Sequence, residues 1–478
     1  MESVWQHSCE IGRRKPLDRD IECEVLVIGA GMAGILTSYM LKRQGIDVVV
    51  IEAKEIGSGN TGRTTAKITS QHDLIYDNLM SELGEKRARQ YADANQLAIR
   101  KYKEIIEEKN IECDFEEKPA YLYTLGDVEA LYLEGKAATK LGIECEFVKE
   151  IDLPFEINLA LKFNNQAQFN PLNFMKRVAE ELVVYEYTTA LEVKENFVLT
   201  NRGKIKANSI VIATHFPIIN VPGYYFARMH QERSYIIALE NTQEINGMYI
   251  DIGENGYSFR NYEDLLLLVG GNHRTGKKEG SSYEVLREIG TKLFPNSKEK
   301  YCWSAQDCMT LDRIPYIGKY SSEESNIYVA TGFNKWGMTS SMVSAMILSD
   351  MILGKDNEFK EVFSPERFDI SMSIGDFLEN GIEVTKGFLG EKIHIPKEHI
   401  ESIEKGHGGI VEYNDEKVGV YKNKEGEVFI VTIKCPHLGC ELQWNSDELS
   451  WDCPCHGSRF DFRGRWLDSP AIGGLCHE

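Results

Sequence analysis

Residues 24–66 constrain the fold of this chain more than any other stretch. An apolar run, VLVI at residues 25–28, leads into the glycine-rich turn GAGMAG at residues 29–34, and a helical segment then leads to a second apolar run, VVVI at residues 48–51. Continuous apolar runs of this kind are typical of parallel strands that are covered on both faces. The order of strand, turn, helix and strand therefore predicts the opening unit of a dinucleotide-binding fold.

The glycines of this turn have separate expected roles. Gly29 permits the tight turn, Gly31 lets a pyrophosphate approach the backbone, and Gly34 lets the helix of residues 35–43 pack against the first strand. Glu52 stands at the tip of the second strand, where its carboxylate can bind ribose hydroxyl groups. The alternative is a glycine-rich βαβ turn that binds no phosphate, and the acidic residue disfavours it.

The loop of small residues at 57–66, GSGNTGRTTA, favours FAD over NAD, because a nicotinamide enzyme usually continues into its next helix here. With this loop, residues 22–355 resemble the D-amino-acid oxidase and glycine oxidase family of flavoproteins. The other segments that carry the resemblance are QFNP at 168–171, IVIAT at 210–214, DRIPYIG at 312–318 and YVATGF at 328–333.

The resemblance implies that FAD lies along the loop of residues 57–66 and meets the chain again further on. A backbone group near Ala190 would meet the adenine. A helix that begins after Gly337 would point its N-terminus at the flavin, where it can stabilise the anion formed on reduction. The remaining residues expected at the cofactor are Ser58, Thr64, Thr65, Gly318, Gly332 and Met338.

Catalytic residues are less well defined by the sequence. Lys335 and Trp336 lie in the segment expected nearest to the flavin ring, and His72 follows the flavin loop. A lone histidine is more often a structural hydrogen-bonding group than a catalytic one. An arginine could pair with a substrate carboxylate, and the candidates are Arg228, Arg233 and Arg260.

The cysteines give a second, independent signal. Of eleven cysteines, four fall in the segments CPHLGC at 435–440 and CPCHGS at 453–458. A Cys/His doublet on each of two loops suits a Rieske centre, in which two thiolates hold one iron and two imidazoles hold the other. A zinc site would accept the same ligand types and is the alternative.

The chain resembles Rieske proteins over residues 390–474, and this resemblance assigns the site. The implied cluster ligands are Cys435, His437, Cys453 and His456, and the implied disulfide joins Cys440 to Cys455. Ser458 matches a hydroxyl that donates to a cluster sulfide. Phe460 stands where a tyrosine is expected, so one hydrogen bond is lost and the reduction potential should be somewhat lower.

The chain of 478 residues is too long for a single core. We expect a mixed α/β, Rossmann-type FAD domain with an inserted substrate-covering sheet, over residues 22–355, followed by a small all-β Rieske domain. Within the first part, FAD binding should use residues 22–72, 170–215 and 305–355. A polar, glycine-punctuated segment at 356–390 is the expected connector, and residues 391–478 form the expected Rieske domain.

Charge and hydropathy exclude several classes of partner. The formal net charge of −20 argues against nucleic acid and anionic membranes, and no apolar run is long enough to span a bilayer. The N-terminal residues 1–23 lack the apolar run of a signal peptide, so we expect a cytoplasmic protein.

The sequence therefore predicts an FAD-dependent oxidoreductase that oxidises an amine or amino-acid-like small molecule and passes electrons to its own Rieske [2Fe–2S] cluster and then to an unidentified acceptor. A non-catalytic electron-transfer module or sensor is the alternative. A Rieske oxygenase would need a mononuclear iron site, and His394 and His399 lack a convincing helical setting for one. An NAD(P)H-dependent reductase would need a second fingerprint, which Gly270 and Gly271 do not supply.

Overall fold

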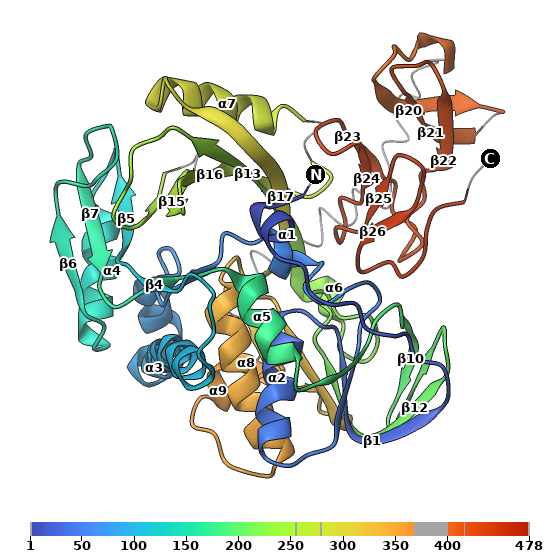
Figure 1. Ribbon diagram of the computed structural model, residues 1–478, viewed down its shortest axis with the longest axis horizontal. Helices are drawn as coiled ribbons and strands as arrows, with labels where there is room; N and C mark the ends of the chain where they lie inside the picture. Colours follow the sequence, from blue (N-terminus) through green and yellow to red (C-terminus); the bar gives the residue numbers. More distant parts are fainter. Residues whose placement is uncertain (1, 254–255, 278–279, 368–399, 415, 477–478) are drawn as a thin grey trace.

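The computed structural model describes residues 2–253, 256–277, 280–367, 400–414 and 416–476. Figure 1 shows a domain built on a mixed sheet, a second sheet of equal strand number beside it, and a small β domain formed by the C-terminal part of the chain. The expected combination of a Rossmann-type domain, an inserted sheet and a separate all-β domain is confirmed.

The mixed sheet, whose central strands are parallel, carries the glycine turn. Its strands β1 (Ile21–Ile28) and β2 (Val48–Ile51) pair in parallel with Val25 opposite Val48, and the strand order is β10-β11-β12-β1-β2-β9. All four residues of β2 are buried, which explains its uninterrupted apolar sequence. The other strands of this sheet are β9 (Val183–Tyr185), β10 (Ala190–Lys194), β11 (Phe197–Thr200), β12 (Lys204–Ile212), β18 (Tyr316–Ser321) and β19 (Glu324–Thr331).

Helices cover this sheet, and two of them start at glycine turns. Helix α2 (Met32–Arg43) begins three residues before the expected start at Ile35, and α8 (Gly337–Ile352) packs against it. Helix α3 (Tyr76–Lys109) breaks at Gly84, which has a left-handed φ of 77°. The remaining helices here are α1 (Val4–Ser8), α5 (Pro171–Ala179), α6 (Tyr225–Arg228), α9 (Lys360–Phe363), and the 3-10 turns η1 (Asn60–Arg63) and η2 (Pro365–Arg367).

The second large sheet confirms the substrate-covering sheet expected within residues 22–355. Its order is β17-β13-β16-β15-β14-β5-β7-β6, and helices α4 (Glu129–Lys140) and α7 (Ser282–Leu293) pack on it. Its strands are β5 (Ala120–Thr124), β6 (Cys145–Val148), β7 (Leu159–Phe163), β13 (Met229–Glu240), β14 (Met248–Asp251), β15 (Ser258–Tyr262), β16 (Leu265–Arg274) and β17 (Lys298–Thr310). A small sheet of β3 (Lys67–Ile68), β4 (Glu116–Glu117) and β8 (Ala167–Gln168) links the two large ones.

The C-terminal β domain consists of two small antiparallel sheets. Strands β20 (Gly408–Tyr413), β21 (Glu416–Lys422) and β22 (Val428–Thr432) form the first, after the 3-10 turn η3 (Ile400–Ser402). Strands β23 (Gln443–Asn445), β24 (Ser450–Asp452), β25 (Arg459–Asp461) and β26 (Trp466–Asp468) form the second. The chain order of the second sheet places the two Cys/His segments on neighbouring loops.

Part of the expected connector packs on the first domain, since Arg367 Nε donates to Asp312 Oδ2 at 3.0 Å. The rest of the expected connector lies outside the described residues, as do His394 and His399 of the expected Rieske domain, so the domain boundaries stay a prediction. None of the helices in the described ranges is long and apolar enough to cross a membrane.

Candidate functional site

The glycine turn between β1 and α2 allows the backbone to pass where side chains would not fit. Gly29 has a left-handed φ of 107°, and a Cβ atom there would lie 2.5 Å from the Ala213 carbonyl oxygen. A Cβ atom on Gly34 would lie 1.9 Å from the Gly29 carbonyl oxygen. Gly31 lines the cavity described below, and an ideal Cβ there would make only an ordinary contact, with Thr61 Oγ1 at 3.4 Å. Gly29 and Gly34 therefore permit the turn, while Gly31 leaves room for a ligand.

We predict that Gly34→Ala lowers the free energy of unfolding by about 3 kcal/mol and weakens FAD binding, because the new methyl group must displace the Gly29 backbone. Thermal unfolding and the fluorescence of released FAD measure the two effects. Gly12→Ala is the matched control, since its added methyl group meets nothing within 4 Å. Equal behaviour of the two variants would contradict the prediction.

A cavity of about 210 Å³ opens above this turn and has the lining expected of an FAD site. Of the residues predicted to contact FAD, the cavity is lined by Gly29, Gly31, Glu52, Ser58, Thr64, Ala190, Gly337 and Met338. Gly34 packs beneath the turn, and Thr65 lines the neighbouring cavity. In the described part of the chain, Gly318 and Gly332 line neither this cavity nor its neighbour. Gly318 lies against Pro365, and Gly332 lies against Thr310.

Glu52 is held at the cavity wall by the backbone. Its carboxylate accepts hydrogen bonds from the N–H of Ala30 at 2.8 Å and from the N–H of Lys54 at 2.9 Å. Burial raises the pKa of Glu52, while these donors act in the opposite direction. The carboxylate is therefore oriented before any ligand binds, and its contact with a ribose stays a prediction.

A second cavity, of about 260 Å³, adjoins the first. The residues that line both cavities are Asn60, Thr64, Asp307, Lys335, Gly337 and Met338. Lys67 lines the second cavity and donates a hydrogen bond to Ser258 Oγ. Burial, together with the nearby Arg260 guanidinium, lowers the pKa of Lys67 to about 7. The second cavity thus holds an amine that is partly neutral near neutral pH.

The predicted catalytic candidates differ in their surroundings. Lys335 lines both cavities and forms an ion pair with Glu232 at 2.7 Å. Trp336 lines the second cavity and stacks on His72 at 4.9 Å between ring centroids. His72 is buried, with Nδ1 2.7 Å from Tyr91 Oη and Nε2 2.7 Å from the Thr69 carbonyl oxygen. These contacts favour a supporting role for His72 behind Trp336.

The arginines proposed for a substrate carboxylate are used elsewhere. Arg260 donates to the carbonyl groups of Thr65 and Ala66, at 2.6 Å and 2.9 Å, and so supports the flavin loop. Arg228 donates to the Pro365 carbonyl group, and Arg233 pairs with Glu448. Because all three guanidinium groups have protein partners and line neither cavity, the structure does not place them where a substrate carboxylate would bind.

Sequence reasoning missed the N-terminal segment, which completes the flavin loop. Trp5 in α1 is fully buried, and its Nε1 donates to the Thr64 carbonyl oxygen at 2.6 Å. The Arg260 guanidinium lies 5.4 Å from the centroid of the Trp5 ring system. A tryptophan four residues from the start of the chain was the only available signal.

The Cys/His segments form two loops at one end of the small domain. Backbone hydrogen bonds close each loop, from Gly439 N–H to the Cys435 carbonyl oxygen at 2.8 Å and from Gly457 N–H to the Cys453 carbonyl oxygen at 2.9 Å. A disulfide joins Cys440 to Cys455 and confirms the implied pairing. The sulfur atoms of this bridge and of Cys453 lie within 4.8 Å of one another, so the disulfide borders the predicted cluster site.

The two histidines meet at this end of the domain. The ring centroids of His437 and His456 are 4.9 Å apart, and the Nδ1 atoms of both are buried without a hydrogen-bond partner in the described structure. Burial lowers the pKa of His437 to about 4, and burial with the charges of His437 and Arg274 lowers the pKa of His456 to about 3. Neutral imidazoles with unpartnered Nδ1 atoms are the form that binds a metal.

The thiols complete a donor set that fits a [2Fe–2S] cluster. A hydrogen bond from the Cys453 thiol is the main cause that lowers the pKa of Cys435 to about 7. Ser458 Oγ accepts a hydrogen bond from Ala471 N–H at 3.0 Å, which leaves its own hydrogen free to donate toward the site. Two thiols and two imidazoles with unpartnered Nδ1 atoms, one thiol and one imidazole from each loop, match the ligand set of a Rieske centre.

The first domain covers the histidine edge of this site. Phe226 approaches His456 with ring centroids 5.8 Å apart, and Phe216 lies 6.4 Å from His456. His437 Nε2 lies 2.8 Å from Asn220 Oδ1, so with Nδ1 bound to iron the Nε2–H group would donate to this oxygen. The predicted cluster therefore faces the first domain.

The small domain also contributes to the wall of the FAD cavity, which the sequence did not indicate. Lys54 donates to the Leu467 carbonyl oxygen, and Arg63 lies 3.7 Å from the Asp468 carboxylate. The residues of the small domain that line the cavity are Trp466, Leu467, Asp468, Ser469 and Ile472. The two predicted cofactor sites thus share one interface.

Comparison with known proteins agrees with this architecture. Residues 24–351 match the family described as FAD dependent oxidoreductase, and residues 395–476 match the Rieske [2Fe-2S] domain. A putative Rieske 2Fe-2S iron-sulfur protein of Bacillus subtilis, YhfW, is 40% identical over 99% of this chain and 97% of its own length.

Solved structures resemble the first domain. Glycine oxidase from Geobacillus kaustophilus superposes with a TM-score of 0.62 at 17% identity, covering 73% of this chain and 99% of that one. An L-amino acid deaminase from Proteus vulgaris, with a specific insertion deleted, gives a TM-score of 0.60 at 18% identity, covering 75% and 97%. At these identities the likeness establishes the shared fold.

Proposed function

The chain belongs to the family of FAD dependent oxidoreductases and carries a C-terminal Rieske [2Fe–2S] domain, and from this premise we propose that it oxidises an amine or amino-acid-like substrate and passes the electrons to its own cluster. FAD supplies a two-electron acceptor for hydride from the carbon next to the amine, and the cluster supplies a one-electron acceptor. Two proteins that share the fold are named glycine oxidase and L-amino acid deaminase, and both names indicate amino acid substrates.

One observation carries the proposal: the FAD cavity adjoins both a second cavity and the cluster loop. Six residues line both cavities, so a small molecule in the second cavity would lie beside the bound cofactor. Gln306 also lines the FAD cavity, and it donates to the Gly457 carbonyl oxygen at 2.8 Å, next to the predicted ligand His456. Substrate, FAD and cluster can therefore follow one another in that order.

Residues of the second cavity can prepare the substrate for oxidation. Hydride leaves the carbon more easily when the neighbouring nitrogen is neutral, so a bound ammonium group must first lose a proton. Lys67 lines this cavity, and its surroundings lower its pKa to about 7. Its neutral form can therefore accept the proton of the substrate ammonium group. Asn60 donates to Asp307 Oδ1 at 2.9 Å and fixes a carboxylate at the boundary of the two cavities.

We predict that the rate of flavin reduction by an amine rises as the pH increases through about 7, and that Lys67→Met removes this dependence. Below its pKa the Lys67 side chain is already protonated and cannot accept the substrate proton; above it, the neutral amine can. Rapid-mixing absorbance at several pH values measures the effect. Lys319→Met, at an exposed position, should keep the parental profile, and an unchanged profile in Lys67→Met would exclude Lys67 as the base.

Anaerobic rapid mixing with a panel of amines and amino acids tests the proposed function. Matched pairs, such as alanine with ethylamine and proline with pyrrolidine, separate substrates that carry a carboxylate from those that do not. We expect loss of the flavin absorbance at about 450 nm, followed by reduction of the cluster. If the cluster stays oxidised while hydrogen peroxide forms in air at the turnover rate, the cluster is not the outlet. If no amine reduces the flavin, a redox module without substrate oxidation is favoured.

A further inference from the structure

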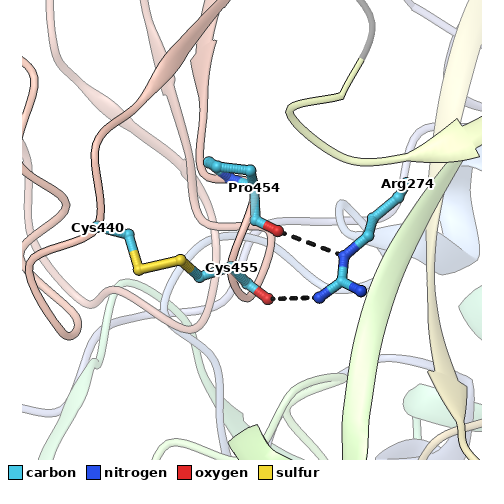
Figure 2. Close-up of a disulfide and its surroundings, with 4 residues drawn as sticks. All are labelled: Arg274, Cys440, Pro454 and Cys455. Atoms are coloured by element: carbon cyan, nitrogen blue, oxygen red, sulfur yellow. Dashed lines mark hydrogen bonds between the residues drawn. A yellow bond between two sulfur atoms is a disulfide. The ribbon is translucent and has the colours of Figure 1, made fainter. Parts of the chain in front are cut away.

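The cluster loop presents four consecutive carbonyl groups to the first domain, and all four accept hydrogen bonds. Figure 2 shows the Arg274 guanidinium, at the end of β16, donating to Pro454 at 3.4 Å and to Cys455 at 3.3 Å, beside the disulfide. The next two carbonyl groups along the loop, those of His456 and Gly457, accept from Gln231 and Gln306, at 2.6 Å and 2.8 Å, respectively. We call Arg274, Gln231 and Gln306 the carbonyl clamp.

The two glutamines of the clamp orient each other. Gln306 Nε2 donates to Gln231 Oε1 at 2.8 Å, and Thr275 Oγ1 donates to Gln306 Oε1 at 3.0 Å. Gln231 is 1% exposed and Gln306 is 5% exposed. Buried amides with satisfied partners have fixed directions, so their N–H groups point at the loop.

The loop is shaped to receive these side chains. Gly457 has a left-handed φ of 82°, and a Cβ atom there would lie 2.7 Å from Gln231 Cβ. A side chain at this position would separate the loop from β13. The glycine therefore serves contact with the first domain as well as the turn itself.

We propose that Arg274, Gln231 and Gln306 are positioning residues that hold the cluster loop at the wall of the FAD cavity and raise the reduction potential of the cluster. The inference rests on the proposed function for its purpose, which is to draw electrons from the flavin. The potential of an iron–sulfur cluster depends on nearby charge, hydrogen bonds and solvent exposure. The Arg274 cation favours the added electron, and the donors of the clamp draw electron density from the carbonyl groups of the loop that carries Cys453 and His456.

The interface has a second anchor that does not involve the clamp. Glu448 of the small domain accepts a hydrogen bond from Tyr283 Oη at 2.7 Å and pairs with the fully buried Arg233 at 3.2 Å. Asp447 accepts from the backbone N–H of Ser282 at 2.8 Å. These contacts should keep the domains docked when one clamp residue is replaced, so clamp variants report on the loop itself.

A redox titration of the full-length holoprotein, with the cluster followed by electron paramagnetic resonance, tests the proposal. We expect Arg274→Met to make the cluster about tenfold harder to reduce, a shift of about 59 mV to lower potential for a one-electron couple. Arg274→Lys keeps the positive charge, so its cluster potential should fall by less than that of Arg274→Met. Arg287→Met is the matched control, because Arg287 pairs with Glu284 and Glu299 on α7 and β17 without touching the loop.

A potential for Arg274→Met equal to that of Arg287→Met would overturn the proposal. If Arg274→Met fails to retain its cluster, Arg274→Lys and Gln231→Met decide the question by the same titration, and parental potentials in both would also overturn it. Iron and FAD contents per chain identify variants that have lost a cofactor. The titration uses no substrate, so its outcome is independent of whether the flavin reduces the cluster during turnover.

Discussion

Cys453→Ser is expected to abolish the electron paramagnetic resonance signal of the reduced cluster while FAD stays bound. Cys453 is buried beside Cys435 in the predicted ligand set, and the loss of one thiolate leaves an iron of the cluster without a ligand. The loop should keep its shape, because backbone hydrogen bonds and the disulfide from Cys440 to Cys455 close it without metal. Electron transfer to a one-electron acceptor should then fall to the rate that FAD alone supports.

The matched control is Cys476→Ser, an exposed free cysteine of the same domain, which should retain both cofactors. Iron, sulfide and FAD contents per chain give the measurement, together with the spectrum after dithionite reduction. Retention of a rhombic cluster signal in Cys453→Ser would show that Cys453 is not a ligand. Simultaneous loss of FAD would show that the part of the FAD cavity wall formed by the small domain depends on the bound cluster.

Arg459→Met is expected to have the largest effect on stability. Arg459 is 2% exposed, and its guanidinium pairs with Asp452 at 2.9 Å, Asp468 at 2.8 Å and Glu448 at 3.4 Å. Removal of one member of a buried ion cluster costs about 3–5 kcal/mol, because the remaining charges are left without compensation. Since Asp468 also lines the FAD cavity, we expect the variant to release FAD at a lower temperature than the parent protein.

The loss of stability in Arg459→Met should be smaller at low pH than at neutral pH. Burial alone would raise the pKa of Asp468, but Arg63 and Arg459 hold it well below its usual range. A depressed carboxylate pKa contributes stability above the unfolded value of about 3.9, and that stability is lost as the pH falls through the folded value. The difference between Arg459→Met and the parent should therefore be full at neutral pH and shrink below about pH 4.

Thermal unfolding and FAD release across this pH range give the test. The matched control is Arg465→Met, because Arg465 is 70% exposed and pairs with Asp461 at the surface of the same sheet. Its loss should change stability by about 1 kcal/mol or less. If Arg459→Met and Arg465→Met unfold at the same temperature at neutral pH, the buried ion pairs of Arg459 do not stabilise the interface.

The sequence by itself determined the features that depend on short segments. The continuous apolar runs of β1 and β2, the spacing of Gly29 and Gly34, and the loop after Glu52 predicted the cofactor-binding unit, since each is a local backbone requirement. The resemblance of the two Cys/His segments to Rieske proteins implied the disulfide of Cys440 and Cys455, which the structure confirms. The cofactor-binding pattern lies within one unit of strand, turn, helix and strand, where spacing along the chain fixes spacing in space.

Only the tertiary structure decided what the long side chains do. Arg260 was a candidate for a substrate carboxylate, but folding places its guanidinium against the carbonyl groups of Thr65 and Ala66. Likewise, Gln306 and Arg274 lie on strands of the second sheet, and nothing in their sequence surroundings marks them as partners of the cluster loop. A polar side chain takes its role from the partner that folding brings near, and these partners lie more than 150 residues away in the chain.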